Sequence, residues 1–179
     1  MAENTHRLTR AIHWVMAALV LFMLGLGLLM TYFELYKYYP LHKSLGIIAC
    51  LAVIFRVYWR LRHPWRSSAT GSASARVVHF VHWGLLLLLM LMPVFGLMFS
   101  GFGGYGVELF GLVLIPHNYD ASWAAIPFHA GLASFGQLAH QVAGYTLCGF
   151  VALHIAAALK HHFIEKDDTL RRMLGKTRD

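Results

Sequence analysis

Histidine is the residue type in this sequence whose number and positions point most directly to chemistry. The chain contains 12 histidines among 179 residues, and half of them lie in long apolar stretches, where ionisable side chains are uncommon and usually functional. A lone intramembrane histidine often only hydrogen-bonds a neighbouring helix, but this number needs a stronger explanation. The histidines in the apolar stretches are His13, His42, His79, His82, His140 and His154.

The spacing of His140 and His154 predicts two metal sites stacked along one helix. These residues are 14 positions apart, or four turns at about 3.5 residues per turn in a left-handed bundle, so both face the same seam. At about 1.5 Å per residue they stand about 21 Å apart along the helix axis. One metal ion cannot bridge that distance, but two haem irons, one near each membrane surface, can each bind one of these imidazoles.

Each iron then needs a second axial ligand at the matching depth. His13 follows Arg10 by three residues, on the same side of the membrane as His154. His42 opens the second apolar stretch on the opposite side, level with His140. The sequence therefore predicts the ligand pairs His13 with His154 and His42 with His140.

A flat macrocycle also needs a small residue beside each ligand, about four positions along the helix. Large residues follow His79 and His82 at that offset, so these two histidines are weaker candidates. They can line a substrate pocket, relay protons or hydrogen-bond a neighbouring helix. The small residues that follow the four predicted ligands are Ala17, Gly46, Gly144 and Ala158.

The composition indicates a membrane protein. Apolar residues make up 58% of the chain and charged residues 13%, whereas a soluble domain carries about 25% charge. A membrane-spanning helix needs about 20 mainly apolar residues, and four stretches meet or approach that length. We expect an all-α integral membrane four-helix bundle, with residues 1–179 forming one membrane-embedded domain that holds the two haem groups. The expected spans are residues 8–32, 41–62, 75–99 and 135–163.

The distribution of charge predicts the orientation. The chain has 15 basic and 8 acidic residues, but the basic residues flank the spans, so the excess indicates topology and no nucleic-acid partner. They precede the first span, surround the linker between the second and third spans, and follow the fourth span. Arg66 lies in that linker. Only Lys37 and Lys43 lie on the other side. By the positive-inside rule both termini face the cytoplasm, and residues 100–134 form a long outer loop.

The cysteines limit the type of cofactor. Cys50 and Cys148 both lie in apolar stretches, and neither belongs to a C-x-x-C-H motif. They therefore indicate no disulfide framework and no covalently attached c-type haem. A histidine-lined metal-ion transporter is a further hypothesis, but the spans lack carboxylates.

Several motifs together resemble the bacterial cytochrome b-561 family over nearly the whole chain. In chain order they are Arg7-Leu8 with His13-Trp14, His42-x-Ser44-x-Gly46, His79-x-x-His82 with Pro93-x-x-Gly96, His140-x13-His154, His161-His162-Phe163, Lys166-Asp167-Asp168-Thr169-Leu170 and Arg172-Met173. Each element is weak alone, but their order and spacing are specific. The outer loop departs most from the family pattern.

The resemblance implies a multi-pass protein of the bacterial inner membrane that holds two haem b groups, each bound by two histidines. Such proteins pass electrons between a donor outside and the quinone pool. The family includes a superoxide oxidase, which converts superoxide to oxygen and reduces ubiquinone, and we expect that activity without an obligate protein partner. The alternative is an electron-transfer cytochrome b subunit that serves another respiratory enzyme.

Three further residues are candidates for substrate contacts. His161 lies seven residues, about two turns, beyond His154, which suits a hydrogen-bond donor to a quinone carbonyl. Lys43 and Lys37 lie near His42 and provide positive charge that can steer anionic superoxide. The alternative for both lysines is that they anchor the second helix at the membrane surface.

Overall fold

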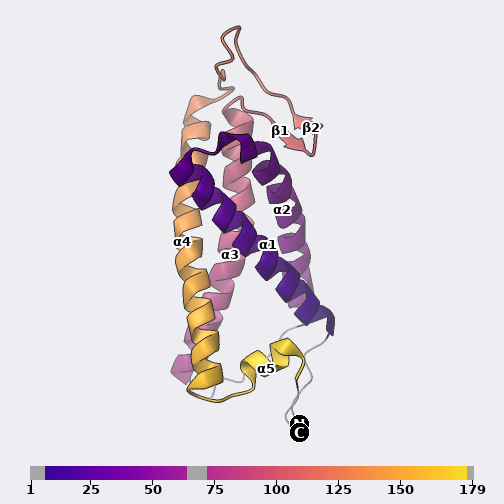
Figure 1. Cartoon of the computed structure of the whole chain (residues 1–179), viewed down its shortest axis with the longest axis vertical. Coiled ribbons are helices and arrows are strands. Elements are labelled where there is room, and N and C mark those ends of the chain that lie inside the picture. Colours follow the sequence, from indigo (N-terminus) through magenta and orange to yellow (C-terminus); the bar gives the residue numbers. More distant parts are fainter. Residues whose placement is uncertain (1–6, 64–71, 177–179) are drawn as a thin grey trace.

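Four long helices form most of the chain (Figure 1). The computed structural model describes residues 7–63 and 72–176, so Arg66 and most of the linker between the second and third helices lie outside the described residues. Each helix is long and apolar enough to cross a membrane, which makes the chain an integral membrane protein. The helices are α1 (Arg7–Phe33), α2 (Tyr39–Arg62), α3 (Ser72–Phe102) and α4 (Ala130–Phe163).

Short elements mark the two ends of the bundle. A 3-10 turn, η1 (Tyr36–Tyr38), joins α1 to α2, and the strands β1 (Val107–Leu109) and β2 (Leu112–Ile115) follow α3. A short helix, α5 (Thr169–Leu174), follows α4 at the opposite end. We call these ends the hairpin end and the α5 end.

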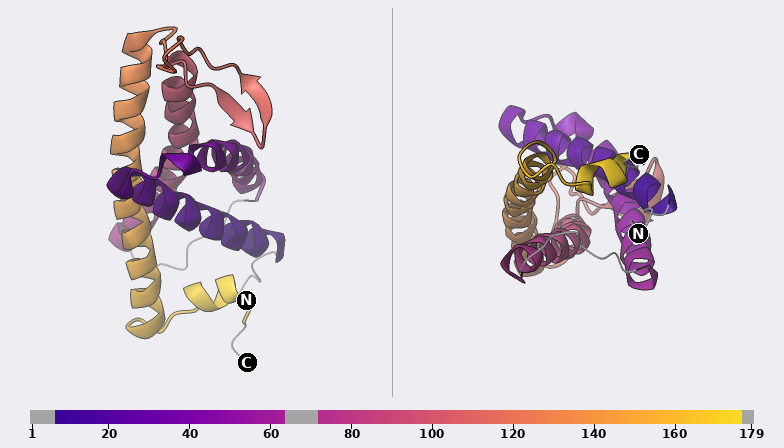
Figure 2. Two further views of the ribbon diagram at one scale, coloured as in Figure 1. Left: turned by 45° about the horizontal axis from the view of Figure 1, so that its top comes forward. Right: turned by 90° about the horizontal axis from the view of Figure 1, so that it is seen from below.

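The closest helix packing is between α3 and α4, which lie side by side in Figures 1 and 2. Glycine permits this approach, because a β-carbon on Gly136 would lie 2.6 Å from the backbone nitrogen of Phe99 and 2.8 Å from the β-carbon of Met98. Small residues at helix contacts are typical of membrane bundles. Among the described residues α1 packs mainly against α2, and α2 also contacts α3.

The long loop after α3 contains a β-hairpin that the sequence analysis did not predict. Strands β1 and β2 pair antiparallel, and the two residues between them, Phe110 and Gly111, have φ angles of 47° and 91°. Positive φ at both positions is typical of a type I′ turn, whose twist matches that of paired strands. The hydroxyl of Ser44 on α2 accepts a hydrogen bond from the Phe110 backbone N–H at 2.9 Å and donates to the Glu108 carbonyl at 3.1 Å.

Two helix boundaries differ from the expected spans for identifiable reasons. Helix α4 begins at Ala130 rather than at residue 135, because Nδ1 of His129 accepts the Leu132 N–H at 3.1 Å and caps the first turn. Helix α3 remains helical through Pro93 and ends at Phe102. Both helices therefore extend beyond the apolar core towards the hairpin end.

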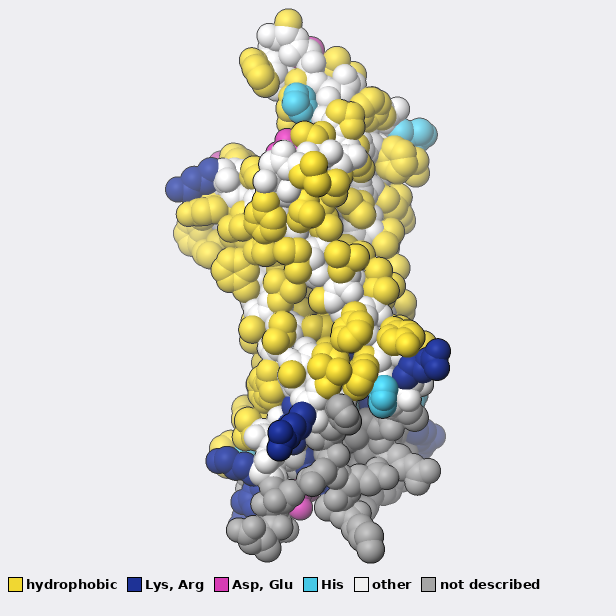
Figure 3. Space-filling view, turned by 90° about the vertical axis from the view of Figure 1, so that its right-hand side faces the viewer, with side chains coloured by type: hydrophobic (Ala, Val, Ile, Leu, Met, Phe, Trp, Pro, Cys, Tyr) yellow, Lys and Arg dark blue, Asp and Glu magenta, His cyan; other side chains and the backbone are white. Residues whose placement is uncertain are grey.

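Charge and apolar surface are separated along the molecule. Figure 3 shows hydrophobic side chains over the middle of one face, with most of its Lys and Arg at the α5 end. Large side chains such as Val15, Leu51 and Leu153 are more than 60% exposed on the spans. An apolar surface of this kind on long helices is suited to contact with lipid.

Candidate haem sites

At the hairpin end, His42 of α2 faces His140 of α4. Their ring centres are 6.1 Å apart, and the ring planes are inclined by 83°. Nδ1 of His140 lies 2.9 Å from the backbone carbonyl oxygen of Met92 on α3, which fixes the ring and leaves Nε2 for another partner. Nδ1 of His42 is buried and makes no hydrogen bond among the described residues.

At the α5 end, His13 of α1 faces His154 of α4 in a similar way. Their ring centres are 6.2 Å apart, with the planes inclined by 60°. The structure thus brings together the two pairs that the sequence analysis predicts, and it places them at different depths along α4. His82 of α3 also approaches His154, with ring centres 5.3 Å apart.

The separations of the two facing pairs suit two imidazoles bound on opposite sides of one iron. Metal–imidazole bonds of about 2 Å put the centres of two such rings about 6 Å apart, close to the 6.1 and 6.2 Å found here. His82 lies closer to His154 than this arrangement requires, and its Nδ1 lies 2.7 Å from the carbonyl oxygen of Val78 on its own helix. His79 is exposed. The geometry favours His13 over His82 as the partner of His154.

The residues beside the facing histidines leave room for a flat group. A β-carbon on Gly46 would meet only a methionine methyl at 3.9 Å, and one on Gly144 only another at 3.7 Å. Gly96 belongs to the motif Pro93-x-x-Gly96, to which the sequence analysis assigned no role. It makes room for a histidine ring rather than for the flat group. A β-carbon there would lie 3.2 Å from Cε1 of His140, so glycine gives the His140 ring its space.

The helix packing agrees with this arrangement. Helix α4 carries one histidine of each pair, yet among the described residues its close packing partners are α3 and α5 rather than α1 and α2. The backbones of the helices that carry facing histidines are therefore not closely packed on one another within the described residues. The donor set, the ring separations and the small neighbours fit b-type haem: His13 and His154 could hold one such group, and His42 and His140 another.

Lys43, the residue after His42, forms hydrogen bonds with the backbone just before β1. Nζ of Lys43 donates to the carbonyls of Tyr105 at 3.1 Å and Gly106 at 2.9 Å. Lys37 is exposed and lies over the ring of Tyr38, with Nζ 5.0 Å from the ring centre. Both lysines lie at the hairpin end, and Lys43 connects the start of α2 to the segment that precedes β1.

His161 forms a cluster with two carboxylates that the sequence analysis did not connect to it. Its Nδ1 lies 2.6 Å from a carboxylate oxygen of Glu165 and 2.8 Å from one of Asp167. Hydrogen bonding of Glu165 to Lys160 lowers the pKa of Glu165. Partial burial opposes a lower pKa for Asp167, but hydrogen bonds from Thr169 and the nearby His161 outweigh it and lower the pKa. The spacing His161-x3-Glu165, one helical turn, was the available signal.

The chain is similar to known proteins over nearly its whole length. The family model described as prokaryotic cytochrome b561 matches residues 4–176. The chain is 33% identical to "Cytochrome b561 homolog 2" of Escherichia coli (strain K12), over 95% of this chain and 90% of that protein. It is 29% identical to "Probable superoxide oxidase CybB" of Yersinia pestis, over 93% of each chain. The chain thus belongs to the prokaryotic cytochrome b561 family, whose members are membrane electron-transfer proteins with b-type haem.

Proposed function

We propose that this protein oxidises superoxide at its hairpin end and passes the electrons through two haem b groups to ubiquinone at its α5 end. The observation that carries the proposal is the pair of facing histidine sites, with ring separations of 6.1 and 6.2 Å, at two depths along α4. The similarity to a protein named as a probable superoxide oxidase supports the choice of donor.

The proposed location is the bacterial inner membrane, with both termini in the cytoplasm. Support comes from the basic residues at the α5 end, which include Arg7, Arg10 and Lys160, and from the positive-inside rule. The hairpin end then faces the periplasm. In this orientation superoxide arrives from outside, and the protons needed for ubiquinol enter from the cytoplasm.

The reaction requires two one-electron donors and one two-electron acceptor. Two superoxide anions lose one electron each and become two molecules of oxygen, while one ubiquinone gains both electrons and two protons and becomes ubiquinol. A b-type haem held at each site would supply one-electron redox chemistry. His13 and His154 would hold one group, and His42 and His140 the other.

At the hairpin end, the protein's contribution is electrostatic attraction. Lys43 and Lys37 place positive charge near His42, and positive potential focused at a site raises the capture rate of an anion. Lys43 is held in place by the Tyr105 and Gly106 carbonyls. Its charge is therefore fixed relative to α2, whereas Lys37 is exposed on the connecting turn.

At the α5 end, the proposed role of His161 is to donate a hydrogen bond to a quinone carbonyl. The contacts of Nδ1 with Glu165 and Asp167 orient the ring, so that Nε2 is the atom left for the acceptor. A carboxylate in contact with one ring nitrogen of a histidine fixes the orientation of the ring. His161 lies two turns beyond His154 on the same helix, which links the acceptor site to the nearer haem site.

The test is turnover by the isolated polypeptide. The protein is purified in detergent with its haem, and superoxide is added with and without a soluble ubiquinone, while haem absorbance and quinone reduction are recorded. We expect superoxide to reduce the haem and quinone to reoxidise it, with two superoxide anions consumed for each quinone reduced. The variant His140→Ala is the matched control, because it removes a ligand at the hairpin end and should lose this turnover.

Two outcomes would contradict the proposal. If superoxide does not reduce the haem, the donor is wrong. If the isolated chain transfers electrons from chemical reductants but turns over only with an added protein, the chain is a carrier subunit of another respiratory enzyme.

A further inference from the structure

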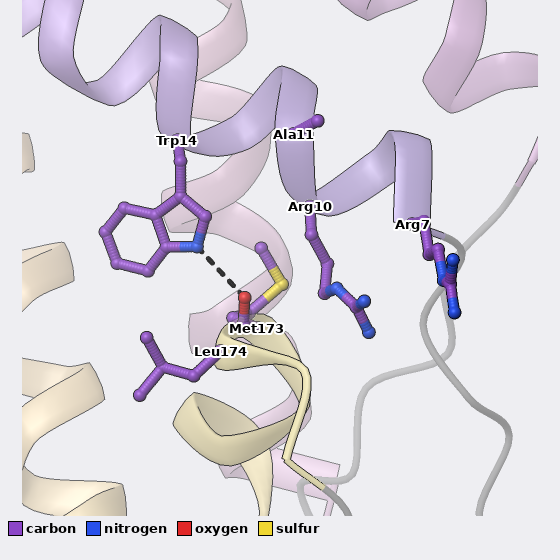
Figure 4. Close-up of a pocket in the computed structure, with 6 residues that line it drawn as sticks. All are labelled: Arg7, Arg10, Ala11, Trp14, Met173 and Leu174. Carbon is purple, nitrogen blue, oxygen red and sulfur yellow. Dashed lines mark hydrogen bonds between the residues drawn. The ribbon is translucent and has the colours of Figure 1, made fainter.

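A cavity of about 500 Å³ opens between the start of α1 and the C-terminal turn of α5. Figure 4 shows Arg7 and Arg10, one turn apart on α1, extending toward the same side as α5. Apolar side chains from both helices form the rest of the lining. The lining residues are Arg7, Arg10, Ala11, Trp14, Met173 and Leu174.

The two helices that form this cavity are joined by specific contacts. Nε1 of Trp14 donates to the backbone carbonyl of Met173 at 2.9 Å (Figure 4). Gly175 ends α5 with φ of +76°, and a β-carbon there would lie 3.0 Å from the guanidinium carbon of Arg10. Glycine at this position therefore lets the chain turn directly beside the Arg10 guanidinium.

The charge of the lining favours an anion. Two of the six lining residues are arginines and none is acidic. Guanidinium groups stay charged at all physiological pH values and bind phosphate oxygens through two parallel N–H bonds. Phosphate carries the negative charge that two arginines attract, whereas a quinone headgroup is neutral.

The apolar part of the lining favours a lipid over a free ion. Trp14 is 44% exposed and Leu174 is 52% exposed, and both lie beside the arginines at the end of a membrane-spanning helix. Tryptophan and arginine are typical of the region where lipid headgroups meet acyl chains. A free phosphate would contact the arginines and leave this apolar wall in water.

We propose that the cavity between α1 and α5 binds the headgroup of an anionic phospholipid, with the phosphate on Arg7 and Arg10 and the acyl chains along Trp14 and Leu174. The lipid holds α5 against α1. None of the six lining residues is a proposed haem ligand, although Trp14 packs edge-on against His13, and the site does not depend on the identity of the electron donor.

The probe is phosphatidylglycerol added to the detergent-purified holoprotein, with phosphatidylcholine as the neutral lipid, and retained lipid is measured by native mass spectrometry. The double variant Arg7→Gln/Arg10→Gln should weaken phosphatidylglycerol binding by about tenfold or more, because charge-assisted bonds at two guanidiniums are lost. Arg62→Gln/Arg76→Gln is the matched control. It removes the same charge from two exposed arginines outside the cavity lining and should leave binding unchanged.

A third variant, Leu174→Asn, tests the apolar wall and should also weaken phosphatidylglycerol binding. An unchanged haem spectrum in all variants shows that the bundle remains folded, and a variant that loses it is replaced by the Arg7→Gln or Arg10→Gln single variant. Equal loss of binding in the Arg62→Gln/Arg76→Gln control would overturn the proposal in favour of general surface charge.

Other outcomes would overturn the proposal in favour of a different ligand. Binding of phosphatidylcholine as tightly as phosphatidylglycerol excludes recognition of the negative charge. Displacement of the lipid by millimolar inorganic phosphate indicates a site for the free ion. Retention of ubiquinone that depends on Arg7 and Arg10, without retention of phosphatidylglycerol, would assign the cavity to the electron acceptor.

Discussion

The hairpin end and the α5 end hold similar histidine pairs in different surroundings. At the hairpin end, the neighbours of the pair are mainly backbone groups: His140 contacts the Met92 carbonyl, and Lys43 contacts the carbonyls of Tyr105 and Gly106. At the α5 end, the His82 ring lies beside His154. About two turns further along α4, the Glu165 and Asp167 carboxylates contact His161, so imidazole and carboxylate groups gather at this end.

This difference suggests a division of tasks between the two ends. Backbone carbonyls do not gain or lose protons in the physiological range, so the hairpin end is suited to a donor that gives up an electron alone. Imidazoles and carboxylates exchange protons with water, so the α5 end is suited to an acceptor that takes up protons with its electrons. Under the proposed function, similar histidine pairs would serve different chemistry at the two ends according to their surroundings.

The largest expected effect is the loss of one haem. It tests whether the chain has two separate sites. His140→Ala should remove the group at the hairpin end, and His154→Ala the group at the α5 end, because an iron that loses one of two protein ligands is held far less tightly. The haem-to-protein ratio, measured as the pyridine haemochrome, should fall from about two to about one in each variant. Each variant should also lose a different part of the wild-type absorption band.

The control for this experiment uses the other intramembrane histidines. His79→Ala and His82→Ala should keep both groups, since His79 is exposed and the His82 ring is too close to His154 for the opposite axial position. Loss of a haem in His82→Ala, together with retention of both in His13→Ala, would show that the ligand pair at the α5 end is misassigned.

The relative positions of His140 and His154 could be predicted from the sequence because helical periodicity sets the depth and direction of residues on one helix, and the side of the membrane then indicated their partners. The 14-residue separation of His140 and His154 places both on one seam of α4, whatever else the bundle does. The hairpin could not be predicted in this way, although the β-branched residues around Phe110-Gly111 are typical of strands. It depends on Ser44, which lies 66 residues before Phe110 in the sequence and satisfies its N–H.

The surroundings of His161 were also beyond the sequence analysis. Asp167 reaches His161 only because the chain reverses after Phe163, and their separation in the sequence matches no helical turn. Contacts made across a reversal depend on tertiary structure, whereas contacts along one helix follow from periodicity. Gly96 is a second example, because it lies on α3 and makes space for His140 on α4, which no single-helix pattern indicates.

The second effect tests whether the α5 end is the site of proton-coupled chemistry. His161→Leu should slow reoxidation of the haem by ubiquinone by about a hundredfold, a typical contribution of a group that donates a proton. The haem content and the rate of reduction by superoxide should stay unchanged, and stopped-flow absorbance separates the two steps. Unchanged reoxidation by quinone would remove His161 from the acceptor site.

The third effect concerns attraction of superoxide at the hairpin end. Lys43→Glu should slow haem reduction by about tenfold, and Lys37→Glu by less, because a charge near the reactive site steers an anion. Lys43→Arg keeps the charge and should retain most of the rate. The wild-type rate should fall as ionic strength rises, since exposed charges are screened beyond about 10 Å at 0.1 M salt.

Salt dependence separates steering from a structural role of Lys43. Lys43→Glu also loses the bonds to the Tyr105 and Gly106 carbonyls, so a slower variant alone does not identify the cause. A wild-type rate that is indifferent to salt, together with normal rates in both glutamate variants, would contradict steering and leave exposure of the haem edge as the explanation.

The smallest expected effect is on stability, and it concerns the charged side chains at the α5 end. At the hairpin end, backbone carbonyls make the corresponding contacts. The pKa of the Asp167 carboxyl is lower than its ordinary value in the folded protein, so ionised Asp167 stabilises the fold at neutral pH. This stabilisation is lost as the pH falls through the lowered pKa, because the carboxylate is then protonated in both the folded and the unfolded states. Asp167→Asn should lower the free energy of unfolding by about 1 kcal/mol or less, since the group is partly exposed and screened by solvent.

Thermal unfolding of the holoprotein, recorded at neutral and at acidic pH, measures this contribution. The melting temperature of Asp167→Asn should be slightly lower than that of the wild type at neutral pH, and the difference should disappear in acid. Asp120→Asn at the other end is the comparison. Hydrogen bonds from Ser122 and Ala124 within its own loop lower the pKa of Asp120, so this variant shows what local hydrogen bonds contribute without a neighbouring histidine. A difference for Asp167→Asn that persists in acid would mean that Asp167 acts through shape and hydrogen bonding rather than charge, and the α5 end would then resemble the hairpin end more closely than proposed here.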